Sequence, residues 1–229
     1  MTHWSDTLAV FDTETTGLDT RHARIVTCFL GIIGPVGEVH ESHSWLADPG
    51  VEIPEQAAAV HGVTTEMARE QGRDAAEVVA EIGQKVQNYL ADGIPVVAYN
   101  ASYDFSILHH EMLRYGLAPL ADPRPIIDPL VIDRAVDTYR KGKRTLGMAA
   151  AHYLVSLEDS HRADADAIAA GRVAQAIFRA HSDTLTGDAQ WLHDQQIEWA
   201  RAWAENYQKF RRGTGDAGFV ASGQWPVRA

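Results

Sequence analysis

The chain has 229 residues, 45% of them hydrophobic, which is enough to bury the core of one domain with an appendage. Its only cysteine, Cys28, excludes a disulfide framework, so a reducing compartment, the cytoplasm, is expected. No apolar stretch reaches the ~20 residues that span a bilayer, and residues 1–6 lack a signal-peptide pattern, so no membrane partner is expected. A net charge of −11 argues against a broad basic surface for nucleic acid, so any such contact must be local.

The first part of the chain carries strand patterns and then helical ones. Residues 7–11, 24–33 and 38–46 are strand-like runs bounded by turn signals, which predicts three strands in a meander. From Pro54 the pattern becomes helical. Between Ala75 and Leu90 apolar residues recur at helix spacing, and Gly93 ends that helix.

After residue 94 short strands alternate with helices. Residues 95–99 and 126–127 are apolar runs that fit buried strands, and residues 102–115, 145–153 and 163–180 have helical patterns. This alternation predicts an α/β fold in which a mixed central sheet is flanked by helices.

The C-terminal region differs from the rest, so we predict a domain over residues 1–181 and an extension over residues 182–229. The extension holds four of the six tryptophans and ends in a Gly-rich run, residues 212–223. Its aromatic residues fall on one helical stripe, formed by Trp199, Trp203, Tyr207 and Phe210. Such a face must pack on something. The parent domain is the simpler expectation, and another protein is the alternative.

Two carboxylates follow the first apolar strand. Asp12 and Glu14 are two residues apart, so on a strand they point to the same side of the sheet. Acidic residues at strand ends are often only solvated. The following Thr15, Thr16 and Gly17 favour a functional interpretation, because two hydroxyls and a glycine let the backbone turn tightly and approach a ligand.

A third carboxylate, Asp104, lies where a buried strand gives way to a helix. An acid in the first turn of a helix complements the helix dipole, which is the ordinary explanation. The same place also suits a group facing a site beyond the carboxyl ends of the strands, where ligands of α/β folds bind.

The helix from Ala163 offers two further acids, and helical phase distinguishes them. At ~100° per residue, Asp166 lies on the stripe that continues through Ala170, Val173 and Ile177. Asp164 points nearly the opposite way and is expected to be solvated. An ionised carboxylate on the core-facing stripe is costly without a charged or metal partner, so Asp166 is a candidate metal ligand.

His161 precedes this helix, five residues before Asp166. A single histidine is most often structural or exposed, but this one occurs together with four candidate carboxylates from three separate segments. Carboxylates without a cysteine or histidine cluster form a hard-oxygen environment, which suits Mg²⁺ or Mn²⁺ rather than Zn²⁺.

Three segments carry a family resemblance: Phe11-Asp12-Thr13-Glu14-Thr15-Thr16-Gly17, Asn100 to Phe105, and His161-Arg162-Ala163-Asp164-Ala165-Asp166. They resemble the three motifs of the DEDDh 3′→5′ exonuclease family, which includes bacterial replicative proofreading subunits, ribonuclease T and oligoribonuclease. The resemblance covers roughly residues 7–180, and its first and third motifs are specific while the second is looser. It implies a ribonuclease H-like fold.

The resemblance also implies a mechanism with two Mg²⁺ or Mn²⁺ ions. Asp12, Glu14 and Asp166 would hold one ion, Asp12 would also touch the second, and Asp104 would act mainly through metal-bound water. His161 would be the general base, because a near-neutral pKa lets imidazole accept a proton at physiological pH. The product would be a nucleoside 5′-monophosphate.

Substrate contacts follow from the same resemblance. The backbone of Thr15, Thr16 and Gly17 and the side chain of Leu18 would meet the terminal nucleotide, and Asn100 belongs to the second motif. His61 lies in a segment, residues 60–64, that resembles one near the family's substrate cleft, and no catalytic role is assigned to it. Phe105 is expected either to shape the nucleotide pocket or, as its helical phase favours, to lie in the core.

The most basic stretch of the chain is Arg140-Lys141-Gly142-Lys143-Arg144, which carries four positive charges and no acid. It is a candidate for binding the phosphates of the strand. A charge run is also commonly a solvated loop, and this alternative stays open.

We therefore expect an exonuclease that acts on the 3′ ends of single-stranded or frayed DNA in proofreading, repair or recycling. An RNA exonuclease of the ribonuclease T or oligoribonuclease type shares this chemistry and is the close alternative. A non-catalytic nucleic-acid or polymerase-binding module is the alternative from another class, and the intact motif residues argue against it. The aromatic helix would be the element that docks a polymerase or a second copy of the chain.

Overall fold

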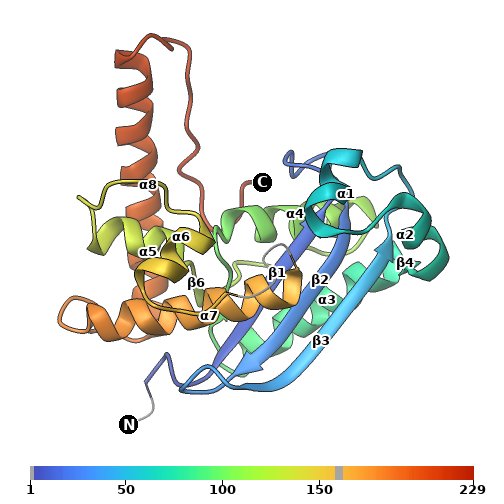
Figure 1. Cartoon of the computed structure of the whole chain (residues 1–229), viewed down its shortest axis with the longest axis horizontal. Helices are drawn as coiled ribbons and strands as arrows, with labels where there is room; N and C mark the ends of the chain where they lie inside the picture. Colours follow the sequence, from blue (N-terminus) through green and yellow to red (C-terminus); the bar gives the residue numbers. More distant parts are fainter. Residues whose placement is uncertain (1–2, 158–161) are drawn as a thin grey trace.

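The computed structural model describes residues 3–157 and 162–229 (Figure 1). Its central sheet has the strand order β4-β3-β2-β1-β5-β6. The strands are β1 (Leu8–Thr15), β2 (Ile25–Ile33), β3 (Val39–Asp48), β4 (Arg73–Asp74), β5 (Val96–Val97) and β6 (Ile126–Ile127). The predicted meander is confirmed, because β1, β2 and β3 pair antiparallel, whereas β5 and β6 continue the sheet parallel to β1. The sheet is therefore mixed, as predicted.

The difference in length between β1 and β5 creates space at one end of the sheet. The parallel pairing joins only Ala9 to Val96 and Val10 to Val97. The chain of β1 continues beside β2 as far as Thr15, with a register shift between Glu14 and Thr15. Beyond residue 10, β1 thus has a strand neighbour on one side only.

The helices agree with most of the predicted ranges. They are α1 (Glu55–His61), α2 (Thr65–Gln71), α3 (Ala75–Ala91), α4 (Ser102–Arg114), α5 (Pro129–Val136), α6 (Leu146–His152), α7 (Ala163–Ala180) and α8 (Ala189–Gly213). Helix α5 was not predicted. Its signals are Pro129 in the first turn and Asp128 as N-cap, whose side chain accepts a hydrogen bond from the backbone N–H of Leu130.

Two apolar layers cover the two faces of the sheet. Ala9 and Phe11 of β1 pack with α3 and α4, whereas Leu8 and Val10 pack with α7 on the opposite face. Helix α7 crosses in front of β1 and β2 in Figure 1. Gly171 permits this close approach, because an added Cβ atom would lie 2.4 Å from the Cγ1 atom of Val10. By strand alternation, Asp12 and Glu14 lie on the α7 face.

The C-terminal extension is bonded to the sheet. Helix α8 lies along β6, where the side chain of His193 accepts a hydrogen bond from the N–H of Ile126 at 3.0 Å. The side chain of Gln196 accepts from the N–H of Asp128 and donates to the carbonyl of Ile126. These contacts satisfy backbone groups at the edge of the sheet. Residues 182–229 are thus packed against the preceding domain.

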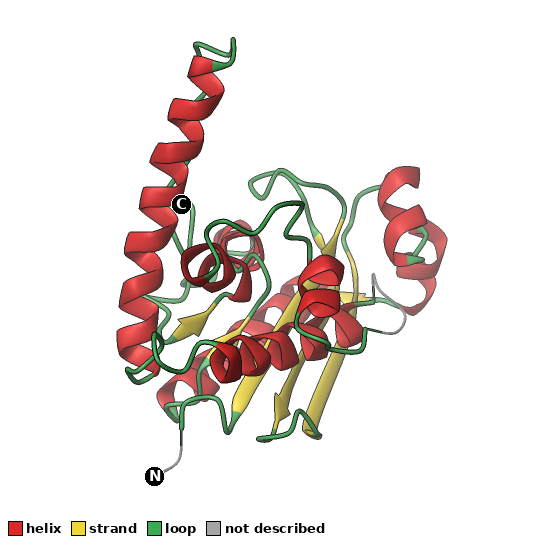
Figure 2. Ribbon diagram, turned by 60° about the vertical axis from the view of Figure 1, so that its left-hand side comes forward, coloured by secondary structure: helices red, strands yellow, loops and turns green. Residues whose placement is uncertain are grey.

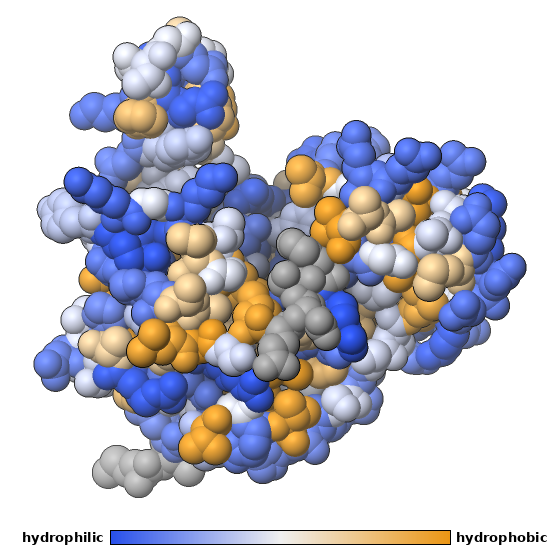
Figure 3. All heavy atoms as spheres, viewed as in Figure 1, coloured by the Kyte–Doolittle hydropathy of each residue, from blue (hydrophilic) through white to orange (hydrophobic). Residues whose placement is uncertain are grey.

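The aromatic stripe of α8 packs on the parent domain only in part. Trp199 is half-buried and contacts both apolar layers, whereas 61% of Phe210 is exposed. Figures 2 and 3 show the outer end of α8 standing clear of the body. The chain then returns beside α8 and buries Trp225, whose ring lies 4.9 Å from that of His193.

Membrane-spanning character is absent from the described helices. None of those within residues 3–157 and 162–229 combines the length and apolar content needed to cross a bilayer.

Candidate active site

Strand β1 presents two acids at the end that β5 leaves uncovered. Asp12 and Glu14 are half-buried on the α7 face, while Thr13 and Thr15 between them are buried on the other face. The strand extends through both acids to Thr15, four residues beyond the predicted end. Their shared side, expected from the spacing, is therefore fixed by β-sheet geometry.

Asp104 occupies the position beside β1 that a longer β5 would fill. Its Oδ1 atom accepts hydrogen bonds from the backbone N–H of Thr13 at 3.0 Å and from the Thr13 hydroxyl at 2.8 Å. Helix α4 begins at Ser102, so Asp104 lies in its first turn and is 3% exposed. Thr13, which sequence reasoning passed over, is thus the residue that orients this carboxylate.

Asp166 lies in the first turn of α7, which packs on β1 and β2. The predicted helical phase is confirmed, because Ala170, Val173 and Ile177 are buried on the stripe that it begins. Asp164 instead pairs with Arg162 at 2.8 Å, and 38% of its side chain is exposed. Of these two acids of α7, Asp166 is the one whose charge raises the pKa values of Asp12 and Glu14.

The charges of Glu14, Asp104 and Asp166 all act on Asp12, so these four carboxylates lie close together. They are here called the β1 acid group. Burial raises the pKa of Asp12 well above its ordinary value, and the charges of Asp104, Glu14 and Asp166 raise it further. The pKa of Glu14 is about 7, because burial and then Asp166 disfavour its charge. Burial raises the pKa of Asp104 to about 7 despite its bonds from Thr13. Burial thus disfavours ionisation of Asp12, Glu14 and Asp104, and the charges of neighbouring acids add to this effect for Asp12 and Glu14.

The β1 acid group fits a hard divalent cation in its chemistry. Its donors are carboxylate oxygens alone, the ligands that Mg²⁺ and Mn²⁺ prefer, and their crowded charges need a counter-ion. Within residues 3–157 and 162–229 no three acidic, histidine or cysteine side chains stand in a ready metal-ligand arrangement. His161 lies outside the described residues.

The segment after Glu14 is held by hydroxyl groups. The Thr15 hydroxyl donates to the carbonyl of Gly17 at 2.9 Å, and the Thr16 hydroxyl accepts from the N–H of Arg24 at 2.9 Å. The hydroxyl of Tyr103 donates to the same Gly17 carbonyl at 2.6 Å and contacts the Thr15 hydroxyl. Tyr103, not singled out from the sequence, therefore joins the first two motifs.

Two features of this turn leave room for a ligand. An added Cβ atom at Gly17 would meet no protein atom within 4 Å, so protein packing does not require glycine at this position. Leu18 beside it is 91% exposed. The turn thus presents backbone and one apolar side chain to the surroundings.

His61 lines a cleft beside the β1 acid group. The cleft has a volume of about 220 Å³, and its walls include Glu14, His61, Arg162 and Asp164. The Nδ1 atom of His61 accepts a hydrogen bond from the N–H of Val63, and burial lowers the pKa of its ring. Contact between His61 and substrate stays a prediction.

The structure decides between the two positions predicted for Phe105 of the second motif. Phe105 is 1% exposed and packs edge-on against Phe11 with their ring centroids 5.5 Å apart. The core position that its helical phase favoured is confirmed, and the substrate contact is wrong. Asn100 is exposed, and its backbone is left-handed with a φ of 64°. Its backbone N–H donates a hydrogen bond to the carboxylate of Asp128, which stabilises this conformation.

The predicted phosphate-binding run is wrong for two of its four cations. Arg140 and Arg144 are 13% and 11% exposed, and both bond the buried carboxylate of Asp133. They stabilise the loop between α5 and α6. Neither of the two predictions, phosphate binding or a fully solvated loop, holds for these two arginines. Lys141 and Lys143 are exposed. The charges of the sequence alone could not reveal that Asp133, 7 residues before Arg140 and 11 before Arg144, pairs with both arginines.

The comparison with protein families decides the kind of protein. The RNase_T model, described as an exonuclease, matches residues 9–174. The chain belongs to this exonuclease family. The prediction from the three motifs is confirmed, and the matched range contains the whole β1 acid group.

Curated relatives of this exonuclease domain are replication proteins. The chain is 31% identical over 168 residues to the PolC-type DNA polymerase III of Lacticaseibacillus paracasei, which is 73% of this chain and 11% of that protein. It is 33% identical over 132 residues to a DNA polymerase III subunit epsilon-like protein of Rhodobacter capsulatus, 57% of this chain and 18% of that protein. The chain therefore spans only about a tenth to a fifth of the length of these relatives.

Solved structures confirm the ribonuclease H-like exonuclease fold. A zinc-bound complex of Escherichia coli exonuclease I with single-stranded DNA has a TM-score of 0.68 at 19% identity, covering 79% of this chain and 42% of the other. Exonuclease X in complex with 5′ overhanging duplex DNA has a TM-score of 0.56 at 20% identity, covering 82% of this chain and 99% of the other.

Proposed function

We propose that the chain is a divalent-metal-dependent 3′→5′ exonuclease that removes nucleotides from single-stranded or frayed DNA ends. The observation that carries this proposal is the gathering of acids from β1, α4 and α7 around Asp12, whose pKa their charges raise beyond the effect of burial. Perturbed carboxylates gathered at the end of a sheet are typical of a functional site. The family match supplies the class of reaction.

In this mechanism Asp12, Glu14, Asp104 and Asp166 hold two Mg²⁺ or Mn²⁺ ions. When bound, such ions supply an activated water and stabilise the charge on the leaving 3′ oxygen. Asp12, central in the group, would be the main holder of the ions, and Thr13 holds Asp104 in place through its two hydrogen bonds. His161 accepts the proton of the attacking water as general base.

The terminal nucleotide lies on the turn after Glu14. The backbone of Thr15 to Gly17 approaches its sugar and phosphate, Leu18 packs on its base, and His61 lines the far wall of the cleft. The open space above Gly17 is consistent with close approach by a ligand. Lys141 and Lys143 stay available for distant phosphates.

Two further expectations belong to this proposal. DNA is favoured over RNA because the exonuclease I and exonuclease X structures contain DNA, and an RNA substrate remains the close alternative. A polymerase or second-copy contact is proposed for the outer stripe of α8, because Phe210 is exposed there and the curated relatives are polymerase proteins. A cytoplasmic location stays a prediction.

One assay tests the function. Single-stranded DNA, duplex DNA and short RNA, each labelled at the 3′ or the 5′ end, are incubated with Mg²⁺, Mn²⁺ or EDTA. We expect a 3′ label to be released as a nucleoside 5′-monophosphate from single-stranded DNA with either metal and not with EDTA. Undiminished activity in EDTA, or release from the 5′ end, would contradict the proposal. Preferential degradation of RNA would select the RNA alternative.

A further inference from the structure

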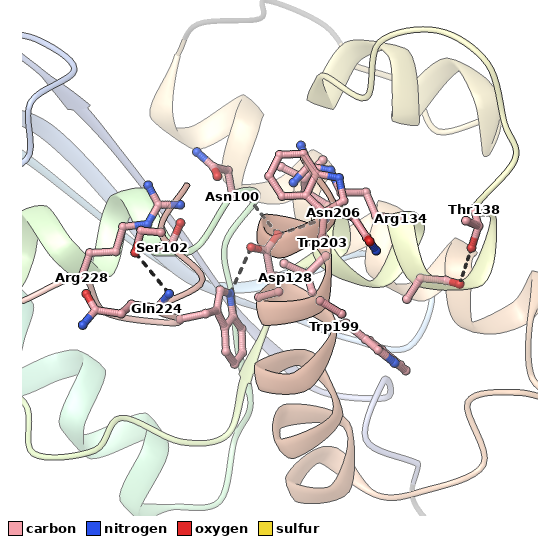
Figure 4. Close-up of a pocket in the computed structure, with 17 residues that line it drawn as sticks. Asn100, Ser102, Asp128, Arg134, Thr138, Trp199, Trp203, Asn206, Gln224 and Arg228 are labelled. Atoms are coloured by element: carbon pink, nitrogen blue, oxygen red, sulfur yellow. Dashed lines mark hydrogen bonds between the residues drawn. The ribbon is translucent and has the colours of Figure 1, made fainter. Parts of the chain in front are cut away.

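A second pocket lies beside the second motif, on the side toward the C-terminal extension (Figure 4). It has a volume of about 230 Å³ and lies between the start of α4, helices α5 and α8, and the last residues of the chain. In Figure 4, Asn100 and Arg228 lie on one side of it, and Arg134 and Trp203 on the other. None of the predicted roles accounts for this combination of two arginines.

Both guanidinium groups are held at the pocket without an acidic partner bonded to them. Within the described parts of the chain, neither Arg134 nor Arg228 makes a side-chain hydrogen bond or ion pair, whereas Arg140 and Arg144 nearby are fully engaged. Arg134 stacks on the ring of Trp203 at 3.8 Å. Desolvation at the pocket lowers the pKa of both arginines, because it disfavours their charge; Arg134 is half-buried, and Arg228 is the more exposed of the two.

The acid beneath the pocket is already occupied by other donors. Asp128 accepts hydrogen bonds from the backbone N–H groups of Asn100, Ala101 and Leu130 and from the indole of Trp225. Its carboxylate therefore attracts the two arginines only at longer range. One buried carboxylate set against two guanidiniums leaves a net positive charge at the pocket, in a protein whose net charge is −11.

The pocket adjoins the β1 acid group. Asn100 and Ser102 line it and precede Asp104 by four and two residues at the start of α4. A strand whose 3′ end lies at the acid group has the pocket within reach of its preceding nucleotides.

We propose that this pocket binds a phosphodiester group of the substrate strand, upstream of the terminal nucleotide, through Arg134 and Arg228. Guanidinium groups match phosphate oxygens in geometry and charge, and they lose less hydration than lysine does. The ring of Trp203 already stacks with Arg134 and with Tyr207, which favours recognition of charge over stacking of a base. This inference rests on the proposed function, and it makes the C-terminal extension part of the substrate site.

Binding of an oligonucleotide tests the pocket directly. Fluorescence anisotropy with a labelled 12-mer of thymidylate, in EDTA so that turnover stops, compares wild type with Arg134→Gln and Arg228→Gln. We expect each variant to bind about tenfold more weakly, the loss of one charge-assisted contact. The slope of log Kd against log salt concentration should fall by about 0.7 per lost phosphate contact. Arg179→Gln is the matched control, because Arg179 is exposed at the end of α7 and away from the pocket lining.

A minimal substrate separates this inference from the proposed function. The p-nitrophenyl ester of thymidine 5′-monophosphate carries a scissile phosphodiester and one nucleoside, so it cannot reach the pocket. We expect both variants to hydrolyse it with unchanged kcat/KM while KM for the 12-mer rises about tenfold. Wild type that cleaves neither substrate would contradict the proposed function and leave the anisotropy test of the pocket intact.

Two outcomes would overturn the inference. One is wild-type affinity and salt dependence for the 12-mer in both variants. The other is an equal loss on the ester and the 12-mer, which would show a general disturbance of the acid group. If Arg134→Gln proves to melt early because Trp203 loses its partner, Arg228→Gln carries the test alone, since its side chain is exposed near the chain end.

Discussion

The β1 acid group and the single acid Asp133 are both shielded from solvent but differ in their partners. In the β1 acid group, Asp12 is half-buried among other carboxylates and Asp104 is buried, and the pKa values of both rise. Asp133, whose side chain is 0% exposed, is bonded by Arg140, Arg144 and the hydroxyl of Tyr153. Burial alone therefore does not mark a functional acid. The sign of the neighbouring charges separates an acid that awaits a cation from one that already has its partners.

The largest expected effect is the loss of turnover in Asp12→Ala. Asp12 lies at the centre of the β1 acid group, so its removal disrupts the whole metal site. We expect more than ~100-fold loss of activity, beyond what an outer-shell change costs. The metal-free variant should fold normally and melt no lower than wild type, because one of several like charges is gone. Rates of 3′-label release check this, and a variant that keeps more than about a tenth of wild-type activity would contradict the role of Asp12 in the metal site.

Replacing the two acids of α7 one at a time tests the helical phase. Asp166→Asn should be nearly inactive, because Asp166 acts on Asp12 and Glu14. Asp164→Asn should keep most of the activity, because Asp164 is partly exposed and paired with Arg162. The same label-release assay ranks the two variants, and the reverse ranking would refute the assignment of Asp166.

His161→Ala sharpens the distinction between groups that hold metal and a group that moves a proton. A positioned general base contributes about 10²–10⁴ in rate, so kcat should fall by that factor while affinity for Mn²⁺ and DNA changes little. The wild-type rate should rise with pH through a near-neutral pKa, and this limb should be missing from the residual activity of the variant. Loss of metal binding or of the folded state would instead make the histidine structural.

Asp133→Ala should show the opposite pattern from Asp12→Ala, with stability lost and chemistry kept. Removing Asp133 takes the shared buried carboxylate from two largely buried guanidiniums and leaves Arg140 only its pair with Asp137, at a cost of about 3 kcal/mol. For a protein of this size we expect the melting temperature to fall by roughly 6–12 °C. Hydrolysis of the minimal ester at 20 °C should stay near the wild-type rate. An unchanged melting temperature would remove the contrast between the two acid groups.

Patterns within one segment predicted the fold well. Strands β1 to β3, helices α3, α4 and α7, and the inward phase of Asp166 follow from local periodicity, which is a property of the residues themselves. The three motifs predicted the family because their residues are read directly from the sequence.

Pairings between distant segments could not be predicted in this way. The bond from Thr13 to Asp104 joins residues 91 apart, and the bond from the N–H of Asp128 to Gln196 joins residues 68 apart. Neither has a periodic signature. The pairing of Arg140 and Arg144 with the buried Asp133 was not predicted either, because a run of positive charges is usually exposed to solvent. Helix α5 was missed because eight residues give a weak periodic signal, although its Asp-Pro start was readable.

The central claim is that the β1 acid group binds a divalent cation, and the melting temperature with and without Mn²⁺ tests it most directly. The pKa values of Glu14 and Asp104 are about 7 in the folded protein, above about 4 when unfolded. Between these values the folded protein holds protons that the unfolded chain has released. The acid group's contribution to stability is therefore lost as pH rises from about 4 to about 7 without metal.

Mn²⁺ should reverse this loss. At pH 8 and a hundredfold excess over Kd, binding to the folded state adds about 2.7 kcal/mol, a rise of roughly 5–10 °C in melting temperature. The rise should shrink toward pH 5, where protons compete for the carboxylates, and should be largely absent in Asp12→Ala at every pH. No rise for wild type at pH 8, or the same rise in Asp12→Ala, would contradict the claim that these acids form the metal site.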